Sequence, residues 1–190
     1  MSHMRTVAAL TMIAGLAMAQ VQAPQPAAKA PPSFLGPCST LTCEVQNDWT
    51  RNNVVLYMLA GAMPEDKYGF KPVPEEQSFG ERVLHVAQVN LSLLQSLGAK
   101  TPAPTIDPKA TSKAEAMAAL QKVGEYGVAA IKEFGDQGLA TRVDSPYFMG
   151  PMASRQRILY FLMAHSQDTY GQLAVYLRLN GITPPLSRQP

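Results

Sequence analysis

The sequence predicts an all-α protein, a four-helix bundle, and three observations support this prediction. Four segments place apolar residues three and four positions apart, which is the spacing of one face of an α-helix. Two of these segments begin with a Ser-x-x-Glu capping box, at residues 78–81 and 112–115. No run between the four segments has the pattern of two strands joined by a tight turn, so we expect no strand pair.

The first residues have the layout of a secretory signal peptide. Arg5 supplies a basic start, and an uncharged apolar run follows over residues 7–18. A small-x-small site predicts cleavage after Ala19, with Ala23 as the alternative end. The apolar run has about 12 residues whereas a bilayer span needs about 20, so an uncleaved anchor is the weaker alternative. We therefore expect an exported protein, secreted or periplasmic.

A spacer rich in proline and alanine is expected over residues 20–43, between the signal and the bundle. It ends with Cys38 and Cys43, the two cysteines of the chain. In an oxidising compartment we expect them to form a local disulfide. Metal-binding or redox thiols are the alternative, but the spacing is neither that of a C-x-x-C redox motif nor that of a zinc site.

The helical domain is expected to occupy residues 44–190. Its first helix is predicted over residues 44–62, because Gly61 and Pro64 interrupt the helical pattern. The side chains predicted to face inward from this helix are Val45, Trp49, Asn52, Leu56 and Leu59.

Three further helices follow in the same domain. The second is predicted from the capping box at Ser78 to Gly98, and the third over residues 112–134. Glycines after Phe134 are expected to end the third helix. The fourth is predicted over residues 154–180, where a glycine and two prolines prevent continuation.

The composition excludes several classes of protein. The chain has 16 Lys+Arg against 14 Asp+Glu, with no block of like charges, which argues against a nucleic-acid surface. The hydrophobic fraction of 46% is enough for a packed core, which excludes wholesale disorder. No Gly-rich phosphate loop, nucleophile elbow or H-E-x-x-H motif is present.

The residues that carry chemistry lie on the second and fourth predicted helices. His85 stands among apolar neighbours, and His165, Asp168, Thr169 and Gln172 share one face at offsets of three, four and seven. Two imidazoles and a carboxylate can form a metal site with open positions for water, or the histidines can act as acid and base without metal. The alternative is that each histidine is a single core or surface residue with one hydrogen bond.

Two further residues are candidates for ligand binding. Arg155 opens the fourth helix, where the helix dipole disfavours a cation, so we list it as a residue for an anionic group near the site entrance. A merely solvated side chain is the alternative. Gln172 is listed because it shares the face of His165.

Three segments of the chain resemble a known family. They are the loop AMPEDKYGFKPVPEEQSFGE, the helix SFGERVLHVAQVN and the C-terminal AHSQDTYGQLAVYLRLNGITPPLSR, whose Y-L-R-L-N-G-x-x-P-P-x-S tail is the most specific part. In these segments the region 44–188 resembles the DinB/YfiT-like metalloenzymes. The resemblance implies a DinB-like bundle of the up-down-down-up type and a divalent metal such as zinc, nickel or manganese.

The same resemblance implies three histidine ligands, and this chain departs from it at one. His85 and His165 match two positions, whereas the third falls on Thr169, before Tyr170-Gly171-Gln172. A hydroxyl is a poor replacement for imidazole on a borderline divalent ion. Asp168 is adjacent, but neighbours on a helix point about 100° apart.

Two hypotheses of function follow from these observations. The first is an exported metal-dependent hydrolase or transferase with an incomplete histidine triad. The second is a metal-free module on the same fold that binds a small ligand or a partner. A homodimer is compatible with both hypotheses, and we expect neither nucleic-acid binding nor stable membrane insertion.

Overall fold

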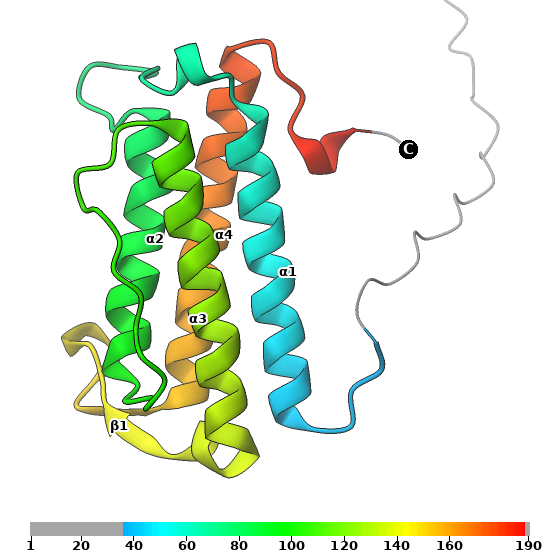
Figure 1. Cartoon of the computed structure of the whole chain (residues 1–190), viewed down its shortest axis with the longest axis vertical. Coiled ribbons are helices and arrows are strands. Elements are labelled where there is room, and N and C mark those ends of the chain that lie inside the picture. Colours follow the sequence, from blue (N-terminus) through cyan, green and yellow to red (C-terminus); the bar gives the residue numbers. More distant parts are fainter. Residues whose placement is uncertain (1–35, 189–190) are drawn as a thin grey trace, which may run out of the picture. The chain divides into compact units, whose positions relative to one another are not determined.

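The computed structural model describes residues 36–188, and its dominant feature is a bundle of four long helices (Figure 1). The helices are α1 (Leu41–Ala62), α2 (Phe79–Ser96), α3 (Lys113–Ala140) and α4 (Arg155–Leu179). The predicted four-helix bundle is confirmed. The predicted signal peptide and most of the predicted spacer lie outside the described residues.

Hydrogen bonds between helix ends reveal the direction of each helix. The ammonium group of Lys113, at the start of α3, donates to the carbonyl oxygen of Gly61, near the end of α1, at 2.8 Å. The guanidinium of Arg155, at the start of α4, makes two such contacts. It donates to the carbonyl oxygen of Leu97, the C-cap of α2, at 2.7 Å. It also donates to the carbonyl oxygen of Gly138, in the last turn of α3, at 3.0 Å. Helices α2 and α3 are therefore parallel, and their connection runs the length of the bundle, as Figure 1 shows.

Both capping boxes predicted from the sequence are formed. The Ser78 hydroxyl accepts from the amide of Glu81 at 3.2 Å, and the Glu81 carboxylate accepts from the Ser78 amide at 2.6 Å. Ser112 and Glu115 make the same pair of contacts at the start of α3. Each box satisfies amide groups that the first helical turn leaves unpaired, which is worth about 1 kcal/mol of stability.

The core forms where the apolar faces of the four helices meet. All five residues predicted to face inward from α1 are buried, among them Trp49, which has no exposed surface. The Trp49 indole donates to the Gly124 carbonyl oxygen of α3 at 2.9 Å. A Cβ atom at Gly127 would lie 2.3 Å from the same ring, so only glycine allows this close approach of α1 and α3.

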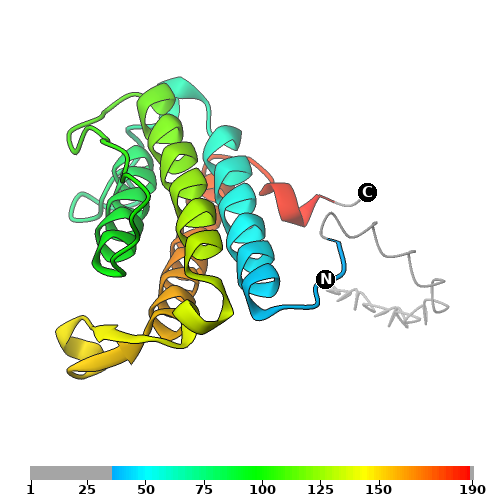
Figure 2. The ribbon, with the colours of Figure 1, turned by 60° about the horizontal axis from the view of Figure 1, so that its bottom comes forward.

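The prediction that no strand pair is present is wrong. Strands β1 (Arg142–Asp144) and β2 (Met152–Ser154) pair antiparallel between α3 and α4, with Val143 opposite Ala153 (Figure 2). Each strand has three residues, too few to show the alternation that identifies a strand in a sequence. The domain is therefore helical apart from this short ribbon.

Two predicted helix boundaries need correction. Helix α1 begins at Leu41 rather than Glu44, because the Thr40 hydroxyl accepts a hydrogen bond from the Cys43 amide and caps the helix. Cys43 therefore belongs to the helix and not to the spacer. Helix α3 continues to Ala140, and Gly135, with φ of 62°, interrupts it as a kink rather than ending it. No helix within residues 36–188 is long and apolar enough to cross a membrane.

Candidate functional site

Helices α2 and α4 bring His85 and His165 together, and both side chains are partly buried. The centroids of the two imidazole rings lie 5.7 Å apart and the rings meet edge to face at 63°. The Nδ1 atom of His165 is buried and has no hydrogen-bond partner among residues 36–188. A buried polar atom without a partner costs free energy, so this nitrogen is a candidate contact for a ligand.

The surroundings of His165 favour its neutral form. Burial lowers the pKa of His165, the neighbouring His85 lowers the pKa further, and Asp168 opposes both effects. His165 is therefore a neutral imidazole at neutral pH, which is the form that offers a lone pair to a metal.

The donor set around the pair fits a divalent ion held by two protein ligands. Two imidazoles that share an ion at about 2.1 Å have ring centroids roughly 5–6 Å apart, which the observed separation matches. Thr169 is buried one turn after His165. Across residues 36–188, no group of three His, Cys, Asp or Glu side chains is arranged to hold a metal. Water would therefore complete the coordination.

A buried hydrogen bond that sequence reasoning missed joins the same two helices. The Asn90 amide of α2 donates to the Ser166 hydroxyl of α4 at 3.0 Å, and both residues are buried. Ser166 follows His165 directly, so this contact helps to hold the register of α4 against α2. The sequence offered one indication of this contact, because Asn90 and Ser166 are polar residues on helix faces that are otherwise apolar.

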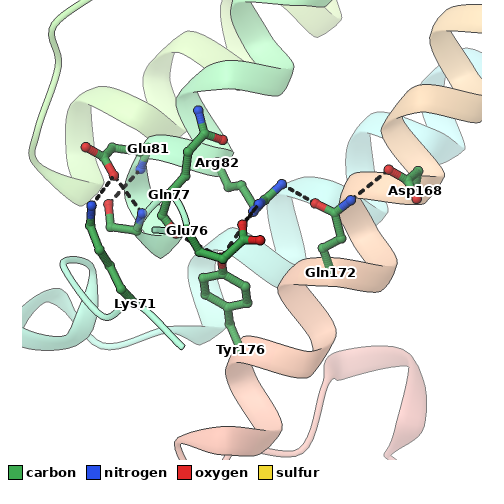
Figure 3. A network of polar contacts seen from close by, with 9 residues as sticks. Lys71, Glu76, Gln77, Glu81, Arg82, Asp168, Gln172 and Tyr176 are labelled. Atoms are coloured by element: carbon green, nitrogen blue, oxygen red, sulfur yellow. Dashed lines mark hydrogen bonds and ion pairs between the residues drawn. The ribbon is translucent and has the colours of Figure 1, made fainter. Parts of the chain in front are cut away.

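Arg82 is the centre of a second polar cluster on α2 and α4 (Figure 3). Its guanidinium forms an ion pair with Glu76, donates to the Gln172 side-chain oxygen, and donates through Nε to the Tyr176 hydroxyl at 3.1 Å. Gln172 continues the chain by donating to the Asp168 carboxylate at 2.8 Å. Gln172, predicted as a binding residue, therefore connects Arg82 to the carboxylate next to the histidine pair. The sequence held no signal for Arg82, because its partners come together only in the fold.

Arg155 has internal partners that its sequence position did not reveal. Besides the two carbonyl oxygens at the ends of α2 and α3, its guanidinium lies over the Phe134 ring, 4.5 Å from the centroid. These contacts give Arg155 a structural role where the ends of α2 and α3 meet the start of α4. They lend no support to the predicted contact with an anionic ligand.

Cys38 and Cys43 lie at the start of α1. Their sulfur atoms are 2.00 Å apart, as a disulfide. The bond connects the short segment before Thr40 to the first turn of the helix. The disulfide contradicts the alternative interpretation, in which the two cysteines are free thiols that bind a metal or react in redox chemistry.

Comparison with known families identifies a family for this chain. The model of the DinB superfamily matches residues 46–173, which is more than half of the chain. No curated protein matches this sequence.

Three solved structures that resemble this fold come from two Bacillus species. A DinB-like protein from Bacillus cereus is 21% identical, with a TM-score of 0.67, over 77% of this chain and 96% of its own. A DinB-like protein from Bacillus subtilis is 19% identical, with a TM-score of 0.60, over 77% and 99%. YfiT from Bacillus subtilis, described as a probable metal-dependent hydrolase with an unusual four-helix bundle topology, is 15% identical, with a TM-score of 0.58, over 78% and 94%. At these identities the likeness concerns the fold.

Proposed function

Since this chain belongs to the DinB superfamily, we propose that it is an exported metal-binding member in which His85 and His165 hold a divalent ion for a hydrolase or transferase reaction. The observation that carries the proposal is the histidine pair itself, with its 5.7 Å ring separation and the buried, unpartnered nitrogen of His165. The description of YfiT as a probable metal-dependent hydrolase supports the reaction class.

At such a site, some residues would bind the metal and another would accept a proton. His85 and His165 bind the ion, which is zinc, nickel or manganese in this proposal and supplies Lewis-acid polarisation of a substrate or a water. The Asp168 carboxylate is exposed and is oriented by its hydrogen bond from Gln172, which Arg82 holds in turn. Asp168 is therefore the group that can accept a proton from a substrate or from water.

Export is the second part of the proposal. The signal-peptide pattern lies outside the described residues, and its support is the sequence of residues 1–19, or 1–23 with the alternative cleavage site. The disulfide between Cys38 and Cys43 adds support, because disulfides persist in oxidising compartments. Amino-terminal sequencing of the mature protein tests the cleavage site.

The metal content of untagged protein tests the first part. Mass spectrometry of the protein purified from its native compartment should find about one divalent ion per chain. His85→Ala and His165→Ala should both lose the ion, whereas Gln121→Ala, at an exposed position of α3, should retain it. An unchanged metal content in both histidine variants would remove the proposed site.

A metal-free binding module on the same fold is the second candidate function. Thr169, which occupies the position implied for a third histidine, is the observation that favours it. In that case the purified protein would contain no metal, would not take up added zinc at micromolar concentration, and would keep its melting temperature in chelator. Either function is compatible with a homodimer, for which sedimentation should give twice the mass of the chain.

A further inference from the structure

A cavity of about 310 Å³ lies between α1 and α4, apart from the histidine pair. Its lining comes from three elements, α1, α4 and the short 3-10 helix Pro185–Ser187 that follows α4. The lining residues used below are Asp48, Arg51, Asn52, Met163, Gln167 and Leu186. In Figure 2 the C-terminal segment, in red, returns beside α1.

The cavity and the histidine pair lie on different sides of α4. Met163 and Gln167, which line the cavity, are each two residues away from His165 in the sequence. Residues two apart on an α-helix point about 200° apart around its axis. Occupation of the cavity is therefore separate from any metal at the histidines.

One residue that lines this cavity has an unpartnered buried amide nitrogen. Asn52 is only 4% exposed, and its side-chain oxygen accepts a hydrogen bond from the Gln167 amide. Its Nδ2 atom is buried and has no hydrogen-bond partner among residues 36–188. A buried donor without an acceptor costs free energy. Because Asn52 lines the cavity, a small rotation of its side chain would bring this donor to an acceptor atom bound there.

The rim of the cavity carries one charge of each sign. Arg51 and Asp48 are both exposed, and the side chain of neither makes a hydrogen bond or ion pair within the described part of the chain. They are three residues apart on α1 and so lie on the same side of the helix. The remaining wall includes the apolar side chains of Met163 and Leu186.

We propose that this cavity binds a small zwitterion with an apolar side chain, of amino-acid or dipeptide size. Its carboxylate would accept hydrogen bonds from Arg51 and from the free N–H of Asn52, and its ammonium group would pair with Asp48. Its apolar side chain would contact Met163 and Leu186. A simple anion would meet the charge of Asp48 and a simple cation that of Arg51, so the two rim charges together select a zwitterion.

Three probes that differ by one group test this proposal. L-leucine carries both charges, isocaproate lacks the ammonium group, and isoamylamine lacks the carboxylate. Each is titrated into the isotope-labelled mature protein while the side-chain NH₂ resonance of Asn52 is followed by NMR. We expect a saturable shift with leucine, and binding about tenfold weaker with each of the other two, because each loses one charge-assisted contact.

Matched variants connect each group of the ligand to its residue. Arg51→Gln should reduce the preference for leucine over isoamylamine, because only the Asn52 contact to the carboxylate would remain. Asp48→Asn should abolish the preference for leucine over isocaproate. Arg157→Gln, an exposed arginine of α4 outside the cavity, should leave all three affinities unchanged. Both test residues are exposed, so the variants should fold. Absence of a saturable Asn52 shift with every probe at millimolar concentration, or equal affinity for the three probes, would overturn the proposal.

Discussion

Two polar clusters lie on α2 and α4, and they differ in how completely their atoms are hydrogen-bonded. In the Arg82 network, which comprises Arg82, Glu76, Gln172, Tyr176 and Asp168, the guanidinium has three side-chain partners (Figure 3). Two of these partners, Gln172 and Tyr176, make a further hydrogen bond of their own. In the histidine pair, a buried nitrogen has no partner among residues 36–188.

This difference separates Arg82, whose contacts are structural, from the histidine pair, where a buried atom lacks a partner among residues 36–188. A satisfied, partly buried network stabilises one arrangement of the elements that it joins, here the loop before α2, α2 itself and α4. An unsatisfied buried atom costs stability and persists where a ligand completes it. The comparison therefore predicts that changes at the Arg82 network alter stability, whereas changes at the histidine pair alter ligand binding.

The largest expected effect comes from restoring the missing ligand. Thr169→His should tighten zinc binding by roughly 100-fold, because even outer-shell partners of metal ligands contribute about 10–100-fold. Thr169→Cys tests the same point with a side chain of nearly unchanged volume, since Thr169 is buried. Thr141→His, at an exposed position, is the control. Competition with a zinc chelator measures the affinities, and equal values for all four proteins would show that Thr169 does not face the pair.

Removing the centre of the satisfied network should give the next largest effect. Arg82→Met leaves Glu76, Gln172 and Tyr176 without their shared donor, and the Arg82 side chain is only 18% exposed. We expect the free energy of unfolding to fall by about 2 kcal/mol, measured by urea denaturation. Metal content should not change. The exposed Arg157→Met should cost less than about 0.5 kcal/mol, and a similar loss in both variants would refute a special role for the network.

Acid titration should distinguish the histidine pair from the Ser78–Glu81 capping box, which lies beside the Arg82 network. Burial and His85 lower the pKa of His165, so in metal-free protein the unfolded state binds the extra proton first, and stability falls as the pH drops below about 6.5. Hydrogen bonds from Ser78 lower the pKa of Glu81, beside the Arg82 network. Its contribution is therefore present above about pH 4.5 and is lost only as the pH falls further.

Urea denaturation at a series of pH values in chelator measures both effects. His165→Gln should flatten the dependence in the upper range and leave the lower range unchanged. Glu81→Gln should do the reverse. A single acid transition that neither substitution alters would contradict the separation of the two regions.

The smallest effect is expected beside the network, at the ion pair of Lys71 and Glu81. Lys71 pairs with Glu81 at 3.6 Å, but their side chains are 43% and 57% exposed. Lys71→Met should therefore change the free energy of unfolding by less than about 0.5 kcal/mol, and added salt should reduce the difference further. A loss comparable with that of Arg82→Met would show that the ion pair is part of the network.

Local sequence patterns predicted most of the fold but little of its polar contacts. The capping boxes and the inward stripe of α1 could be read because the residues concerned are three or four positions apart. The β1–β2 ribbon was missed because three residues do not establish an alternation. The extra turns of α1 and α3 depended on a single threonine cap and on a glycine that kinks a helix instead of ending it.

In the candidate site, too, local sequence patterns could be predicted but contacts between distant residues could not. His85 and His165 could be nominated because polar side chains on apolar stripes are conspicuous, and Thr169 because it departs from a recognisable pattern. The roles of Arg82 and Arg155 could not be predicted, because Arg82 and Tyr176 are 94 residues apart in the chain and Arg155 meets carbonyl oxygens that every residue carries.

By itself the sequence determined where helices form, which faces they bury and which ionisable side chains enter the bundle, because helix periodicity and capping are local properties of the chain. Only the tertiary structure decided which of those polar groups find partners. Hydrogen bonding between elements depends on how α4 packs against α2 and against α1. This packing gives Arg82 its hydrogen-bond partners. The same packing leaves Nδ1 of His165 and Nδ2 of Asn52 without a partner among residues 36–188.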